Sequence, residues 1–335
     1  MPDAVAAPAT RVRSRQGYLS FVAIAVLTAA MALVPLFGSS SLLRFMTELF
    51  MLIALAVAWN LIGGLAGYVS FGHAAFFGLG AYTAGYLLAH EVVPFPVAIA
   101  GAGLLAGLFA FAIGRPILRL RGHYFAIVTL GVAEALRQIA SVLNPITGGG
   151  TGLSVPSLGA ASRMVFYYSM LGLLVVSVVI TAFVLRHRLG YALRAIKASE
   201  DAAATLGVNT TRSKVIAFVI SAAIFGIAGG LYGPWILYID PPTTFSIDLS
   251  VQPVVLAVVG GVGTLWGPVV GGVVVLVLGE AIWGSFAELH TAFLGIVLVF
   301  MVIVLPQGLI SLLRLRGGRR GGLDAILASI RKYSV

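Results

Sequence analysis

Long apolar runs constrain the fold of this chain more than any other feature of its sequence. Apolar residues make up 60% of the 335 residues and charged residues only 10%, whereas an ordinary soluble domain has about 45–50% and about 25%. So few charged side chains cannot cover a water-facing surface, and about 20 consecutive apolar residues can span a bilayer as a helix. The sequence therefore predicts an all-α polytopic membrane protein and excludes a soluble enzyme or a free DNA-binding protein.

Ten apolar segments are predicted as transmembrane helices. They lie at roughly 18–38, 43–62, 68–89, 94–113, 123–142, 165–185, 214–236, 250–263, 267–285 and 290–311. The third is rich in glycine and the eighth is short, so both are candidates for broken or re-entrant helices. The first is longer than the core of a signal peptide, roughly 7–15 residues, and is interpreted as a retained helix. The chain thus divides into a tail at 1–17, a transmembrane domain at 18–311 and a basic tail at 312–335.

The basic residues predict the topology. With the N-terminus inside, 18 of the 21 Lys and Arg residues fall in or at the edge of segments that face the cytoplasm, as expected from the excess of basic residues in cytoplasmic loops. Both termini and the polar loop 186–214 are then cytoplasmic, and the net charge of +10 reflects topology rather than nucleic-acid binding. Seven acidic residues lie toward the outer face, where they either form a docking surface for an extracytoplasmic partner or carry no topological information.

The loop at 186–214 contains the signals of a short capped helix. A good N-cap is followed by two acids, which the helix dipole favours in the first turn, and then by an alanine run that a glycine ends. These residues are Ser199, Glu200, Asp201, Ala202, Ala203 and Gly207. We interpret the segment as a docking element on the cytoplasmic face, because its small side chains suit insertion into a groove of a partner. The alternative is a solvated connector.

Two glycine-rich turns resemble each other, one at 61–67 and one at 258–267. Both end a span on the cytoplasmic side and lead almost directly into the next. Transporters often carry repeats with interrupted helices near the transport path, although independent use of glycine in tight turns would give the same likeness. The candidate path residues are Asn60, Gly63, Gly64, Ser70, His73, Gly260, Gly261 and Gly263. For His73, a hydrogen bond at a helix end is an equally good interpretation.

Signatures of catalysis and of metal binding are missing from the sequence. It has no phosphate-binding loop and no cysteine, and its five histidines lack metal-ligand spacing. Glu134 and Arg137 are three residues apart, so they can pair on one helix face. A structural ion pair near the outer edge of the membrane is the preferred interpretation there, and a substrate contact is the alternative. The chain is therefore predicted to be neither an enzyme nor a cofactor-binding protein.

Several motifs resemble those of a known family of transport proteins. Asp201-Ala202-Ala203 followed by Gly207 is a variant of the E-A-A-x-x-x-G motif of ABC importer permeases, with Asp in place of Glu. The stretch from Asn60 to Tyr82 closely resembles the branched-chain amino acid permease family, which includes LivH and LivM. Stretches 120–131, 147–153, 190–196 and 260–268 are similar to the LivM-type members. The resemblance extends over roughly residues 45–310.

The resemblance implies a permease subunit of an ATP-driven importer in a bacterial inner membrane. It implies a homologous second permease subunit, two ABC ATPase subunits and an extracytoplasmic substrate-binding protein. The segment 199–207 would then be the coupling helix that fits a cleft on an ATPase subunit. Branched-chain or other small aliphatic amino acids are the expected substrates. Urea or short-chain amides, which similar permeases carry, remain an alternative, as does a stand-alone secondary carrier or channel.

Overall fold

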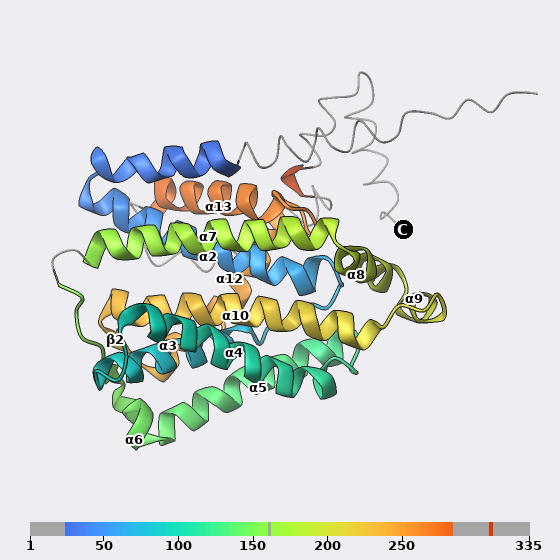
Figure 1. Ribbon diagram of the computed structural model, residues 1–335, viewed down its shortest axis with the longest axis horizontal. Coiled ribbons are helices and arrows are strands. Elements are labelled where there is room, and N and C mark those ends of the chain that lie inside the picture. The colour runs from blue at the N-terminus through green and yellow to red at the C-terminus, as the bar shows by residue number, and fades with distance from the viewer. Residues whose placement is uncertain (1–23, 160–161, 284–307, 311–335) are drawn as a thin grey trace, which may run out of the picture.

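The computed structural model describes residues 24–159, 162–283 and 308–310, and most of them are helical (Figure 1). Six helices in these residues are long and apolar enough to cross a membrane. They are α2 (Ser40–Trp59) with its π-helical continuation η2 (Asn60–Gly64), α4 (Phe95–Ile117), α5 (His123–Val142), α7 (Ser162–Arg186), α10 (Thr210–Ile236), and α11 (Pro241–Thr244) joined to α12 (Asp248–Gly260). The prediction of an all-α, multi-pass protein is therefore confirmed.

Three further helices coincide with predicted spans. They are the helix Ile24–Leu36, which ends in the turn η1 (Val34–Leu36), α3 (His73–Ala89) and α13 (Gly267–Trp283). The third span was predicted from residue 68, but its helix begins only at His73, because Gly67 has a φ of +78° and the chain turns there. The segment 290–311 lies almost wholly outside the described residues, as do the tails 1–17 and 312–335, so a total of ten spans stays a prediction.

Bare glycine backbones hold the centre of the bundle together. A Cβ added to Gly226 of α10 would lie 2.4 Å from the Ala106 Cβ of α4, and one added to Gly229 would lie 1.9 Å from the Phe77 oxygen of α3. A Cβ on Gly80 would in turn lie 2.0 Å from the Gly226 oxygen. Helices in lipid gain little hydrophobic free energy from meeting each other, so such close backbone approach supplies their packing contacts.

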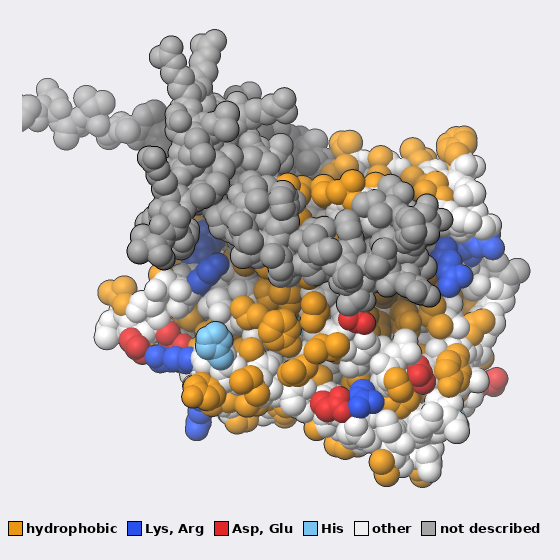
Figure 2. Space-filling view, turned by 180° about the vertical axis from the view of Figure 1, so that it is seen from behind, with side chains coloured by type: hydrophobic (Ala, Val, Ile, Leu, Met, Phe, Trp, Pro, Cys, Tyr) orange, Lys and Arg blue, Asp and Glu red, His pale blue; other side chains and the backbone are white. Residues whose placement is uncertain are grey.

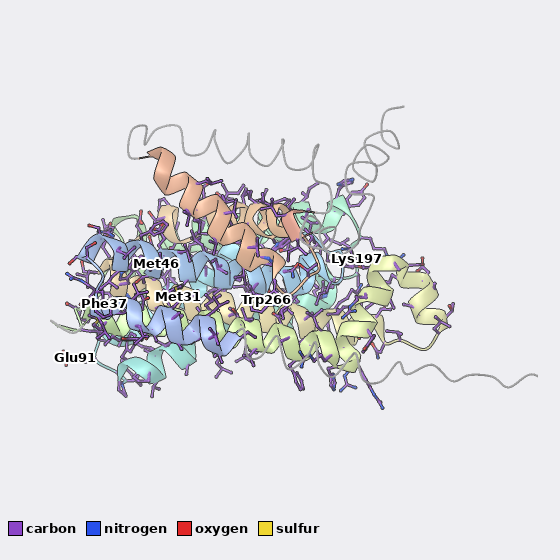
Figure 3. All side chains as sticks on the ribbon, turned by 90° about the horizontal axis from the view of Figure 1, so that it is seen from above. Met31, Phe37, Met46, Glu91, Lys197 and Trp266 are labelled. Carbon is purple, nitrogen blue, oxygen red and sulfur yellow. The ribbon has the colours of Figure 1, made fainter. Side chains whose placement is uncertain are left out.

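The two ends of the bundle are built differently. At one end, α8 (Arg188–Ala198) and α9 (Glu200–Thr205) project from the helices (Figure 1). The other end carries α6 (Asn144–Thr147), η3 (Gly149–Thr151) and a small antiparallel sheet of β1 (Leu153–Ser154) and β2 (Tyr238–Ile239), in which Leu153 pairs with Ile239. Figure 3 shows Phe37 and Glu91 at that end, far from Lys197 at the α8–α9 end. Hydrophobic side chains cover much of the middle of the face in Figure 2.

Candidate functional site

The helix predicted at 199–207 is present as α9. The Ser199 hydroxyl accepts a hydrogen bond from the Ala202 nitrogen at 3.3 Å, and Gly207 has the positive φ, +83°, of a residue that ends a helix. The preceding helix α8 buries Gly190, Leu193 and Ile196. The local cap signals therefore predicted this element correctly, because each acts within a few residues of the chain.

Only part of α9 is available to a partner. Ala203 is 3% exposed and packs in the hydrophobic core, whereas Leu206 directly after the helix is 82% exposed. Ala202, Ala204 and Thr205 are also exposed. We name Ala202, Ala204, Thr205 and Leu206 the tip surface. The sequence placed Ala203 among the docking residues, but its side chain faces the bundle, so it supports the tip surface from beneath.

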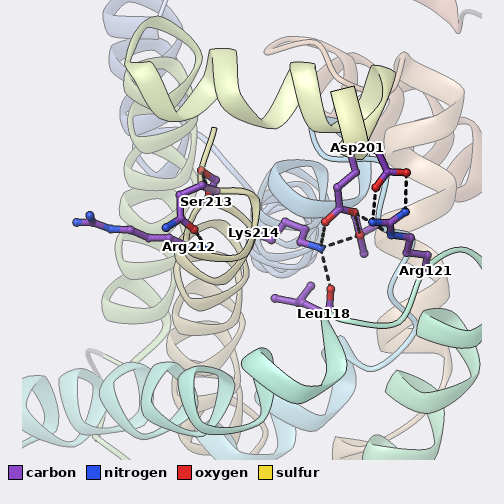
Figure 4. A network of polar contacts seen from close by, with 9 residues as sticks. Leu118, Arg121, Asp201, Arg212, Ser213 and Lys214 are labelled. Carbon is purple, nitrogen blue, oxygen red and sulfur yellow. Dashed lines mark hydrogen bonds and ion pairs between the residues drawn. The ribbon is translucent and has the colours of Figure 1, made fainter. Parts of the chain in front are cut away.

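A buried lysine anchors α9 to the transmembrane helices (Figure 4). Lys214, near the start of α10, is 3% exposed and its ammonium donates three hydrogen bonds. They go to the Glu200 carboxylate at 2.6 Å, the Tyr68 hydroxyl at 2.8 Å and the Leu118 carbonyl at 2.8 Å. An ammonium has only three donors, so it is fully satisfied. The Tyr68 hydroxyl itself donates to Glu200.

A second, exposed layer surrounds this anchor. Arg121, just before α5, makes a two-pronged hydrogen bond to Asp201, at 2.8 and 3.1 Å. Their side chains are 56% and 80% exposed, and such surface pairs contribute little, about 0.2–1 kcal/mol. Removing one partner of a buried pair costs roughly 3–5 kcal/mol, because the other charge is left uncompensated. The Glu200–Lys214 pair therefore holds α9 in place far more than Asp201 does.

The ionisation of these acids follows from their partners. Burial raises the pKa of Glu200, but the hydrogen bonds from Lys214 and Tyr68 outweigh it and hold the pKa below its ordinary value. The hydrogen bond from Arg121 lowers the pKa of Asp201. Burial, together with the neighbouring Glu200, raises the pKa of Tyr68, which keeps its hydroxyl protonated as a donor. The network is thus charged and complete at neutral pH.

The helix α8 is hydrogen-bonded to the first glycine-rich turn, and that region is hydrogen-bonded to the second turn. The Lys197 ammonium donates to the Gly64 carbonyl at 2.9 Å, at the end of the π-helix η2. In the same turn, the buried Asn60 amide accepts from the Gly263 nitrogen at 2.8 Å and donates to the Thr264 carbonyl at 2.9 Å. A Cβ on Gly64 would lie 1.8 Å from the Asn60 Oδ1. The two turns that resemble each other in sequence therefore lie side by side.

Most of the remaining path candidates are buried in this conformation. His73 is 0% exposed and lies 3.1 Å from the Ser70 hydroxyl through Nδ1 and 2.9 Å from the Ser221 hydroxyl through Nε2. Because Ser221 donates its own proton to the Ala58 carbonyl, Nε2 carries the imidazole proton. His73 thus joins the segment just before α3 to the middle of α10. Gly63, Gly260 and Gly261 are buried as well, while Gly263 is half-buried.

Sequence reasoning missed three residues of the anchor and of the exposed layer around it. Tyr68, Arg121 and Lys214 come from separate elements, and Tyr68 lies 146 positions from Lys214. No local pattern links residues so far apart. The one available signal was Lys214 itself, because a lysine at the start of an apolar span needs a partner. Among the described residues, no group of His, Cys, Asp and Glu could hold a metal ion.

The fold and this site define a polytopic membrane protein whose bundle is joined to a helical element at one end. A family model described as the permease component of a branched-chain amino acid transport system matches residues 41–302. The chain belongs to this family of branched-chain amino acid transport permeases. The high-affinity branched-chain amino acid transport system permease protein LivM of Salmonella typhimurium is 32% identical over 84% of this chain and 73% of that protein.

Further relatives give the same assignment. LivM of Escherichia coli K12 is 32% identical over 92% of the chain and 79% of its own length. LivH of Salmonella typhimurium, a permease of the same transport system type, is 25% identical over 77% of the chain and 90% of its own length. No solved structure matches the chain.

Proposed function

We propose that this chain is a LivM-type permease subunit of an ATP-driven importer that carries branched-chain or other small aliphatic amino acids across a bacterial inner membrane. The family match over residues 41–302 carries the transport assignment. Similarity to both LivM and LivH supports a second, homologous permease subunit as partner. Two ABC ATPase subunits and an extracytoplasmic binding protein complete the proposed machine.

The tip surface is the proposed docking point for an ATPase subunit. Leu206 supports this, since an apolar side chain that is 82% exposed beside small exposed alanines fits a partner groove better than open water. The anchor at Glu200 and Lys214 passes movement of α9 to α10, and Lys197 passes movement of α8 to the glycine-rich turns. ATP binding would favour whichever state makes better contacts with the closed ATPase pair.

Substitution of the tip tests the coupling role. We expect Leu206→Asp to reduce substrate uptake at least tenfold, because a charge replaces the apolar contact, while the chain stays folded in the membrane. Leu143→Asp is the matched control. This exposed leucine directly follows α5, at the end of the bundle away from α9, so the variant should retain the ATPase subunits. Uptake and co-purification of the ATPase subunits are measured together. Normal uptake by Leu206→Asp would overturn the docking role.

Two other functions remain to be distinguished. A urea or short-chain amide importer would show the same partners, but the purified transporter would take up labelled urea or amide and not leucine. A stand-alone carrier would emerge from mild detergent without an ATPase or a second permease and would transport without ATP. We expect co-purification of both partners and ATP-dependent uptake of leucine, isoleucine or valine.

A further inference from the structure

The helix α5 leaves one whole face uncovered by the described part of the chain. Only 22% of its apolar window is buried, against 39% to 83% for the other five candidate spans. Phe125, Thr129 and Ala133 face the bundle and are buried, as is Ala140 further along. The exposed positions 131, 134, 135 and 138 follow each other at helical spacing on the opposite side. Something other than the described residues must therefore cover this face.

This face is polar. The Glu134 carboxylate accepts hydrogen bonds from the Arg137 guanidinium at 2.5 and 2.8 Å and from the Gln138 amide at 2.8 Å. The side chains of Glu134 and Arg137 are 52% and 30% exposed. Next to them, a Cβ added to Gly131 would meet nothing within 4 Å, so the surface there is open. The predicted ion pair is thus confirmed, but it lies on the outside of the described bundle.

The position of the pair along α5 argues against a lipid environment. Glu134 is 8 residues before the end of α5 at Val142 and 11 after its start at His123. At 1.5 Å per residue these intervals are about 12 and 16 Å, so in a helix that crosses the membrane the carboxylate would lie inside the hydrocarbon core of about 30 Å. Ionised side chains at such depth face a bundle interior or a water-filled cavity rather than lipid.

We propose that the polar face of α5, formed by Gly131, Glu134, Arg137 and Gln138, lines a water-filled part of the translocation path. There the carboxylate of Glu134 attracts the ammonium group, and the guanidinium of Arg137 the carboxylate, of a zwitterionic amino acid. Gly131 leaves room for the substrate beside the pair. The identity of the substrate rests on the proposed function, whereas the contact with water does not.

Single cysteines test the contact with water, because the chain has no cysteine of its own. Gly131→Cys and Gln138→Cys report on the face. Leu104→Cys is the control, since this leucine is 65% exposed on α4. It lies 9 residues after the start of α4 at Phe95, about 14 Å along the helix, whereas Gly131 lies 11 residues before the end of α5 at Val142, about 16 Å along that helix. The assembled transporter in vesicles is treated from outside with a charged, impermeant methanethiosulfonate reagent, at rest and after trapping with ATP and vanadate.

We expect both face variants to react at least tenfold faster than Leu104→Cys in one of the two states, and excess leucine to slow the reaction of Gln138→Cys. Rates as slow as that of Leu104→Cys in both states would overturn the proposal, whether lipid or a sealed subunit interface covers the face. Fast labelling slowed by urea or an amide, and not by leucine, would support the water-lined face and refute the proposed substrate class. Fast labelling that no solute slows would overturn the contact with the zwitterion.

Discussion

At the scale of single residues, Lys214 determines how firmly α9 is attached. Its three hydrogen bonds reach Glu200 in α9, Tyr68 before α3 and the end of α4 at Leu118, so one ammonium joins four parts of the chain. A buried ammonium is stable only while its charge is compensated. Glu200 supplies that compensation, and Asp201 beside it, although similar in the sequence, does not contact Lys214.

This difference predicts unequal effects of two similar substitutions. Glu200→Gln leaves the Lys214 charge buried without its carboxylate and should cost roughly 3 kcal/mol of stability. Asp201→Asn breaks only an exposed pair with Arg121 and should cost less than about 1 kcal/mol. Thermal unfolding of the purified chain in mild detergent measures both. Equal losses in the two variants would contradict the assignment of Glu200 as the anchor.

The same carboxylate predicts a dependence on pH. The pKa of Glu200 is lower in the folded chain than its ordinary value of 4.5, so its contribution to stability is complete above that value and is lost as the pH falls below it. The difference in unfolding midpoint between the wild type and Glu200→Gln should therefore be large at pH 7 and should shrink as the pH falls below 4.5. The other acids are common to both proteins and cancel. A constant difference across this range would refute the prediction.

At the scale of elements, sequence signals that act locally predicted the structure well. The N-cap at Ser199, the ending at Gly207 and the bounds of α5 at 123–142 all follow from neighbours along the chain. The start of α3 was placed too early, because an apolar stretch can form a loop when glycine turns the backbone. The orientation of Ala203 and the contact between the two glycine-rich turns could not be predicted, since both depend on packing between distant segments.

The contact between the turns can be tested by adding one methyl group. In Gly64→Ala the new Cβ would lie 1.8 Å from the Asn60 Oδ1 and 2.8 Å from the Gly263 nitrogen, so the two turns must separate. We expect a loss of about 1–3 kcal/mol, as for overpacked interiors. Gly172→Ala in α7 is the control, because its Cβ would meet nothing within 4 Å and alanine favours a helix. A stable Gly64→Ala variant with normal uptake would show that the turns need no close contact.

At the scale of the whole molecule, the two ends of the bundle should lie on opposite sides of the membrane. Five of the residues around α8 and α9, Arg186, Arg188, Arg194, Lys197 and Arg212, are basic. The end with β1 and β2 carries Glu91, Asp240 and Asp248. Because basic residues accumulate in cytoplasmic loops, the end with α8 and α9 is expected inside, where an ATPase subunit could reach the tip surface.

Orientation can be read from single cysteines in whole cells, in a chain that has no other thiol. Ser157→Cys lies on an exposed segment next to β1, and Leu206→Cys lies on the tip surface. An impermeant maleimide should label Ser157→Cys in intact cells and Leu206→Cys only after the membrane is permeabilised. The reverse pattern would place the tip surface on the outer side of the membrane, where it could not meet an ATPase subunit, and would remove the basis for coupling through α9. It would leave the family assignment, which rests on the sequence match, untouched.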